Sequence, residues 1–167
     1  LQGVEIEPRD VDLLFRTRED LMAFVRKMHG LTPSSSEAPL SVEDWRSSQA
    51  QPIKTETFPG AFTWHKAAWD IEGVRLDATA IENNGVPDSL HGDGVWEGGD
   101  HVWSFVTRAQ DLPVVALEVQ LESCLRRDLD SRARAIAVCL QHSGYAVERL
   151  VQVLSRGHLE RVRKYLS

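Results

Sequence analysis

The chain has 167 residues, of which 42% are hydrophobic and 26% are charged, which is typical of a globular protein with a core of its own, as one domain or as one domain plus a small helical appendage. Its formal net charge of −6 argues against broad, non-specific binding to nucleic acid. No apolar run approaches the roughly 18 residues that a membrane-spanning helix needs, and no signal peptide is visible. We therefore expect a cytoplasmic protein that does not bind membranes.

The charge is unevenly distributed along the chain. Residues 1–115 carry 10 Lys and Arg against 19 Asp and Glu, whereas residues 116–167 carry 9 against 6. An acidic front part suits cation binding, and a mildly basic tail suits an anionic ligand or a partner, although helix surfaces often carry Arg without such a role. Cys124 and Cys139 are expected to be buried thiols and not a disulfide or a metal-binding pair.

The first expected strand, residues 10–15, begins with two carboxylates and continues with apolar residues. Asp10 and Asp12 would project from the same face, about 7 Å apart, because side chains alternate along a strand. Asp gains nothing from apolar packing, so the pair indicates either a cation site or a strand end that reaches solvent. Before this strand, residues 1–3 resemble the tail of a helix that is closed by Gly3 in the left-handed conformation.

A helix is expected after this strand, from a capping box at residues 17–20 to a stop at Gly30. An irregular connection follows, with one short helix at Ser41 to Ser47. Three antiparallel strands are then expected at residues 53–58, 62–71 and 74–81, with turns at Pro59-Gly60 and Glu72-Gly73. In the third of these strands Asp77 is a mid-strand carboxylate with apolar neighbours, which is an unusual place for a charge.

Residues 83–100 form a glycine-rich loop that either covers a substrate or is a flexible excursion. His91 and Asp93 in this loop could ligate a metal, but such a histidine is more often an ordinary polar residue. We expect a strand at residues 101–108 and a short extended segment at 113–115. Apolar stripes then predict successive helices to the end of the chain, with stops at Gly144 and near Gly157.

Asp10, Asp12 and Asp77 are the residues that best support a chemical function. The sequence contains no glycine-rich phosphate loop of the usual spacing, no dinucleotide-binding fingerprint, no serine elbow and no zinc-ligand spacing. If the strand of Asp77 lies beside the first strand, three carboxylates converge, and they would repel one another unless cations lay between them. Carboxylate oxygens suit Mg²⁺ or Mn²⁺, and two such ions can activate an attacking hydroxyl and stabilise a leaving pyrophosphate.

Three segments carry a resemblance to a known family. Residues 1–14, with the Asp10-Val11-Asp12 run, resemble the D-h-D region of the nucleotidyltransferase superfamily, which includes DNA polymerase beta, aminoglycoside nucleotidyltransferases and minimal bacterial nucleotidyltransferases. Residues 73–78 are similar to the later strand that supplies a third carboxylate. Residues 112–121 resemble the strand-to-helix junction of small bacterial members, including toxin-like ones. The resemblance implies a glycine turn that grips the nucleotide phosphates, and this turn would lie upstream of Leu1.

The resemblance also implies a fold and an activity. The fold would be α+β, with a mixed, largely antiparallel sheet and flanking helices in residues 1–115 and a C-terminal helical part, residues 116–167, packed on the same domain. The activity would be transfer of a nucleoside monophosphate from a nucleoside triphosphate to an unidentified acceptor. Asp10, Asp12 and Asp77 would hold Mg²⁺ or Mn²⁺, and Asp77 would also activate the acceptor. The alternative is an inactive protein of this fold that binds a nucleotide, or binds a protein partner through its C-terminal helices.

Overall fold

The computed structural model describes residues 2–5, 10–29, 45–87 and 92–166. The chain divides into two compact units, one formed by Pro8–Val86 and the other by Leu1–Glu7 together with Pro87–Ser167. We call them the sheet unit and the helical unit and describe each by itself. The boundary expected after residue 115 lies inside the helical unit.

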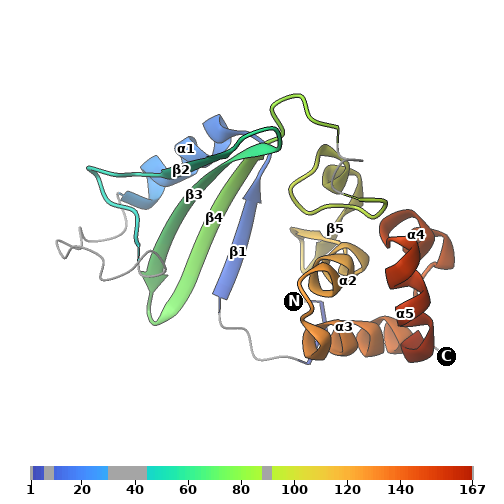
Figure 1. Ribbon diagram of the computed structural model, residues 1–167. Coiled ribbons are helices and arrows are strands. Elements are labelled where there is room, and N and C mark those ends of the chain that lie inside the picture. The colour runs from blue at the N-terminus through green and yellow to red at the C-terminus, as the bar shows by residue number, and fades with distance from the viewer. Residues whose placement is uncertain (1, 6–9, 30–44, 88–91, 167) are drawn as a thin grey trace. The chain divides into compact units, whose positions relative to one another are not determined.

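The sheet unit is built on a four-stranded mixed sheet (Figure 1). Its strands are β1 (Asp10–Phe15), β2 (Lys54–Phe58), β3 (Phe62–Ile71) and β4 (Val74–Glu82), in the order β1-β4-β3-β2. β1 runs parallel to β4, whereas β3 is antiparallel to both of its neighbours. The expected α+β class and the mixed, largely antiparallel sheet are thus confirmed, and each strand lies within one residue of its predicted bounds.

Helix α1 (Arg18–His29) begins at the predicted capping box and packs across one face of the sheet. The Asp20 N–H donates to Thr17 Oγ1 at 3.1 Å, and the Thr17 hydroxyl donates to the Asp20 carboxylate at 2.7 Å. One stripe of the helix is buried against apolar side chains of β1, β3 and β4: Leu21, Val25 and Met28 meet Leu13, Phe15, Ala67, Trp69, Leu76, Ala78 and Ala80. Because side chains alternate along a strand, the residues between these apolar ones face away from α1.

The turn between β3 and β4 fixes the register of these two strands. Glu72 and Gly73 have φ angles of 51° and 84°, as a two-residue hairpin turn of the right-handed sheet twist requires. Ile71 therefore pairs with Val74, and Asp77 lies opposite Ala68. The predicted turn is confirmed, and it decides which β3 side chains lie near Asp77.

The helical unit combines a short helix, a hairpin and a group of α-helices (Figure 1). Its elements are the 3-10 helix η2 (Asp100–Phe105), the strands β5 (Val106–Ala109) and β6 (Leu112–Val115), and the helices α2 (Leu117–Arg126), α3 (Asp130–Ser143), α4 (Val147–Val153) and α5 (Arg156–Leu166). Its core is formed by apolar side chains of these helices, among them Leu121, Leu125, Ile136, Leu150 and Val162. Within the described ranges, no helix is long and apolar enough to cross a membrane.

Two expectations for the helical unit are wrong. Residues 101–108 do not form one strand, because η2 extends to Phe105 and pairing with β6 begins only at Val106. The partner strand, β6, has four residues and pairs with β5 along its whole length. The segment before β5 is helical, and its buried residue is Val102. Gly157 does not end a helix but lies in the first turn of α5, whereas Gly144 closes α3 with a φ of 81°, as expected.

Two expectations concern segments that are described only in part. Gly3 has the expected left-handed φ of 79°, but residues 2–5 form neither helix nor strand. Of the short helix expected at Ser41 to Ser47, the first four residues lie outside the described residues. The remainder is not helical: Ser47 continues the edge of the sheet, since its N–H donates to Ala68 O at 2.8 Å and its Oγ accepts from Ala68 N at 3.0 Å.

Candidate functional site

The parallel pairing of β1 with β4 places the three candidate carboxylates on one face of the sheet. Asp12 lies opposite Asp77 in the register, and Asp10 lies opposite Arg75. Side chains that are opposite in neighbouring strands point to the same face, and alternation puts Asp10 and Asp12 on that face together. This face is opposite to the one that α1 covers, and we call it the polar face.

Asp77 forms ion pairs with two cations on the polar face. Arg75 Nε lies 2.9 Å from Asp77 Oδ2, and Lys66 Nζ lies 3.2 Å from Oδ1. The Asp77 side chain is only 13% exposed. Its hydrogen bond raises the pKa of Arg75, and the negative charges of Asp70 and Asp10 act in the same direction, while burial opposes them. Arg75 is therefore a guanidinium held among three carboxylates.

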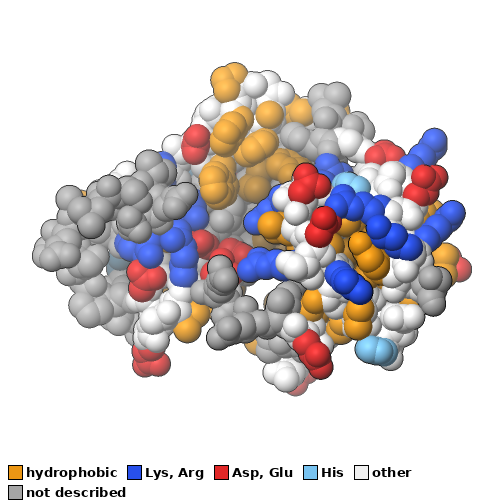
Figure 2. Space-filling view, turned by 60° about the horizontal axis from the view of Figure 1, so that its bottom comes forward, with side chains coloured by type: hydrophobic (Ala, Val, Ile, Leu, Met, Phe, Trp, Pro, Cys, Tyr) orange, Lys and Arg blue, Asp and Glu red, His pale blue; other side chains and the backbone are white. Residues whose placement is uncertain are grey.

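An open depression of about 450 Å³ lies on this face of the sheet unit. It is lined by Asp10, Trp45, Lys54, Glu56, Trp64, Lys66, Arg75 and Asp77. Lys66 Nζ lies 5.5 Å from the centre of the Trp64 ring, as in a cation–π contact. Figure 2 shows basic and acidic side chains next to one another over the sheet unit. Aromatic rings suit a planar base, and ammonium and guanidinium groups suit phosphates, so this lining can receive a nucleotide.

The described carboxylates of the polar face do not form a complete metal-binding site by themselves. No group of three or more His, Cys, Asp or Glu side chains that could hold a metal ion occurs among the described residues. Mg²⁺, however, keeps several waters and is commonly bound by one or two carboxylates together with substrate phosphates. The donors that fit this mode are Asp10, which is half-buried, and Asp12, which is exposed, with Asp77 beside them.

Arg75 and Lys66 were not among the candidate residues taken from the sequence. The signal for Arg75 was available, because a residue two positions before Asp77 in the same strand must share its face. The position of Lys66 depends on the β3–β4 register, in which it lies opposite Thr79, one diagonal step from Asp77. Its proximity to Asp77 follows only once the Glu72-Gly73 turn is known to contain two residues.

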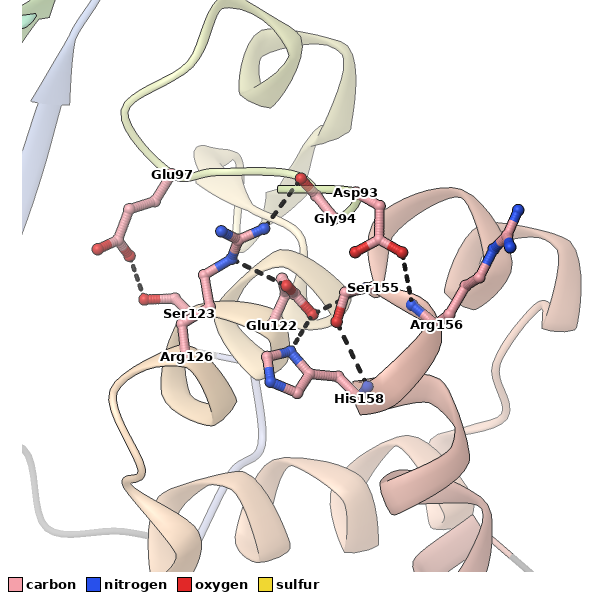
Figure 3. Close-up of polar contacts among 9 residues, drawn as sticks. All are labelled: Asp93, Gly94, Glu97, Glu122, Ser123, Arg126, Ser155, Arg156 and His158. Atoms are coloured by element: carbon pink, nitrogen blue, oxygen red, sulfur yellow. Dashed lines mark hydrogen bonds and ion pairs between the residues drawn. The ribbon is translucent and has the colours of Figure 1, made fainter. Parts of the chain in front are cut away.

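His91 and Asp93 were the alternative metal ligands in the glycine-rich loop. His91 lies outside the described residues, whereas Asp93 lies within them. Asp93 accepts a hydrogen bond from the backbone N–H of Arg156, at 3.1 Å, in the first turn of α5 (Figure 3). This hydrogen bond holds the pKa of the Asp93 carboxyl below its usual value. Asp93 thus stabilises the start of a helix. Cys124 and Cys139 are free thiols, as expected, but both are half-buried, and burial raises the pKa of Cys124.

A second polar cluster surrounds Glu122 in the helical unit (Figure 3). Glu122 is fully buried, and its Oε1 pairs with Arg126 Nε at 2.9 Å. Its Oε2 accepts from the Ser155 N–H at 3.1 Å and pairs with His158 Nδ1 at 2.9 Å. Arg126 also donates to Gly94 O at 3.1 Å. Both carboxylate oxygens are satisfied, so the cluster joins the loop at Gly94 to α2 and to the start of α5, which is a structural role.

The close approach at Gly94 explains why a glycine is needed there. A Cβ at this position would lie 2.4 Å from Glu122 Oε1 and 2.7 Å from the backbone N of Ser155. Neither neighbour can move away cheaply, because one belongs to the buried ion pair and the other to the main chain. Packing therefore explains the glycine at position 94, without any need for a flexible segment that covers a substrate.

Comparisons of the chain with protein-family models, with curated proteins and with solved structures found no match. The resemblance to the nucleotidyltransferase superfamily therefore rests on the sequence of residues 1–14, 73–78 and 112–121.

Proposed function

We propose that the protein is a metal-dependent nucleotidyltransferase that moves a nucleoside monophosphate from a nucleoside triphosphate to an acceptor whose identity is open. The observation that carries the proposal is the parallel register of β1 and β4, in which Asp12 lies opposite Asp77 on the polar face. Carboxylates from two adjacent strands on one face are what the resemblance of the Asp10-Val11-Asp12 strand implies. The cytoplasm, where nucleoside triphosphates are abundant, is the matching location.

In this proposal, different residues of the polar face bind the metal ion, the phosphates and the base. Asp10 and Asp12 would hold Mg²⁺ or Mn²⁺ together with the phosphates, and bound ions of this kind stabilise the charge that develops in an in-line displacement. Arg75 and Lys66 offset the negative charge of the triphosphate, since guanidinium and ammonium groups are the usual phosphate partners. Trp64 offers an aromatic surface to the base.

Asp77 is assigned to the acceptor, as the group that takes a proton from its hydroxyl. A general base must come within about 3 Å of the proton-bearing oxygen. Both oxygens of Asp77 are engaged by cations in this structure, at 2.9 Å and 3.2 Å. The two cations crowd both oxygens, so the opening of one ion pair would give an acceptor hydroxyl direct access to Asp77.

The same ion pairs favour a second candidate function, an inactive protein of this fold. If Arg75 and Lys66 stay on Asp77, the polar face can still bind a nucleotide but lacks a base for the acceptor. A partner bound through the C-terminal helices would fit this candidate, because Val147 and Val151 of α4 are 59% and 57% exposed and lie one turn apart. Basic side chains also gather over these helices in Figure 2.

Calorimetry on the full-length protein tests the proposal. ATP, CTP, GTP and UTP are titrated separately in Mg²⁺ and in EDTA, and we expect at least one of them to bind only when Mg²⁺ is present. Equal binding in EDTA contradicts a metal-dependent site. Incubation of the protein with cell extract and triphosphate labelled at the α-phosphate then separates the two candidates, because only the enzyme produces a labelled acceptor.

A further inference from the structure

The depression on the polar face is balanced in charge. Three of its lining side chains are basic and three are acidic: Lys54, Lys66 and Arg75 against Asp10, Glu56 and Asp77. A divalent cation alone would add positive charge to this balance, and a triphosphate alone would add negative charge. The two together leave it closer to neutral, so the lining favours joint binding over either ligand by itself.

The two cations on Asp77 differ in how firmly they are held. Arg75 donates a hydrogen bond to Asp77 from the same strand, and in the register Arg75 lies opposite Asp10 on β1 and Asp70 on β3. Lys66 reaches Asp77 from the neighbouring strand by an ion pair at 3.2 Å, and its ammonium also makes the cation–π contact with Trp64. An ammonium on a four-carbon stem is a mobile point charge, whereas a guanidinium fork is fixed by its geometry. Lys66 is therefore the cation that can exchange partners.

We propose that Lys66 is an exchangeable counterion: its ammonium neutralises Asp77 in the absence of ligand and transfers to the phosphates when a metal–nucleotide complex binds. This inference rests on the function proposed above and adds the step that frees Asp77. A metal ion alone must displace Lys66 without offering it another anion. A triphosphate offers that anion, so metal and nucleotide each raise the affinity for the other, as linkage requires.

The experiment measures the binding of Mn²⁺ alone, and of Mn²⁺ with a non-hydrolysable ATP analogue, to the full-length parent and three variants. Lys66→Met keeps the aliphatic stem next to Trp64 but removes the charge. We expect it to bind Mn²⁺ alone about tenfold more tightly and the Mn²⁺-dependent analogue about tenfold more weakly, as expected for a partly buried ion pair. Lys66→Arg keeps a cation at Asp77 and should retain the weak binding of Mn²⁺ alone.

Lys54→Met is the matched control, because Lys54 lines the same depression but forms no ion pair with Asp77 in the described part of the chain. It should change the affinity for Mn²⁺ alone less than about threefold, a long-range effect of one partly screened charge. An equal effect of Lys54→Met and Lys66→Met would overturn the proposal, because the overall charge of the face, and not the Asp77 pair, would then be responsible.

The remaining outcomes separate this inference from the proposed function. If the parent shows metal-dependent nucleotide binding but Lys66→Met binds Mn²⁺ alone like the parent, counterion exchange is wrong and the proposed function stands. If the parent binds the analogue equally well without Mn²⁺, both are wrong. Melting temperatures are compared for all variants, and Lys66→Gln replaces Lys66→Met if the latter is unfolded.

Discussion

A substitution at Asp77 tests whether the protein is an active enzyme or an inactive nucleotide-binding protein. Asp77→Asn keeps the size of the side chain and deletes its charge. If Asp77 activates the acceptor, turnover should fall by about 100-fold or more, the range for loss of a general base, and this fall should exceed any change in nucleotide affinity. Calorimetry and the labelled-transfer assay measure the two quantities. Asp70→Asn is the control, because Asp70 lies on the same face of the sheet, on β3, but pairs with Arg46 at 2.6 Å.

The variants Asp10→Asn and Asp12→Asn should behave differently from Asp77→Asn. They remove the donors assigned to the metal, so both metal-dependent nucleotide affinity and turnover should fall. An Asp77→Asn protein that turns over like the parent would refute the role of Asp77 as base. Parent-like behaviour of all three variants would mean that the polar face is not a site at all.

The acidic residues of the candidate site were selected from the sequence, and their basic partners were missed. Asp10, Asp12 and Asp77 stood out because carboxylates in apolar strands lose solvation without gaining packing. Lys66 did not stand out, because a lysine in a strand with one solvated face is ordinary. Its importance comes from the register, which brings it to 3.2 Å from Asp77 and is set by a turn six residues away in the chain.

Among the elements of the helical unit, α2 and the start of α5 depend on the Glu122 cluster. Glu122→Gln removes the charge that pairs with Arg126 and His158 while keeping the shape of the side chain. Breaking a buried ion pair on one side leaves the other charge uncompensated, so we expect a loss of about 3 kcal/mol in the free energy of unfolding. Urea denaturation followed by circular dichroism measures this value.

Glu160→Gln on the exposed side of α5 provides the matched control and should stay within about 0.5 kcal/mol of the parent. A Glu122→Gln protein as stable as this control would show that the cluster contributes nothing to folding.

The start of α5 should also respond to acid through Asp93. The N–H of Arg156 holds the folded-state pKa of Asp93 below its unfolded value. The stabilisation is therefore present above the unfolded pKa, near 3.9, and is lost as the pH falls through the lower, folded value. We expect the parent to melt at a higher temperature than Asp93→Asn at pH 7, and we expect this difference to shrink as the pH falls below about 4. A difference that is constant from pH 7 to pH 3 would contradict this account.

Elements with strong periodicity or glycine turns were predictable, and the others were not. Alternation and the turns at Gly60 and Gly73 located the strands of the sheet unit. The β5–β6 hairpin escaped because its turn uses Gln110 and Asp111, with φ angles of 51° and 65° and no glycine to mark it. Residues 101–108 are rich in valine, threonine and aromatic residues, which are common in strands, whereas η2 places its buried residue, Val102, by a helical turn.

At the scale of the whole molecule, the chain divides into two units within its glycine-rich loop. The boundary at Val86 and Pro87 lies inside the glycine-rich loop of residues 83–100, which was interpreted as a segment that covers a substrate or a flexible excursion. The change from strand-like to helix-like patterning comes later in the chain, after residue 115. Composition alone could not decide between a covering loop and a connection between units, because both are rich in glycine and polar residues.

The candidate site lies wholly within the sheet unit, and this location can be measured directly. The amide resonances of the full-length protein are recorded by NMR while Mn²⁺ is added in small amounts with a non-hydrolysable ATP analogue. A bound paramagnetic ion broadens the signals of nearby residues, so we expect the signals of Asp10 to Asp12 and of Arg75 to Asp77 to disappear first. The same titration of Asp12→Asn should leave these signals sharp. Broadening centred on the acidic residues around Glu122 and Asp93, or no localised broadening at all, would contradict the assignment of the polar face as the metal–nucleotide site.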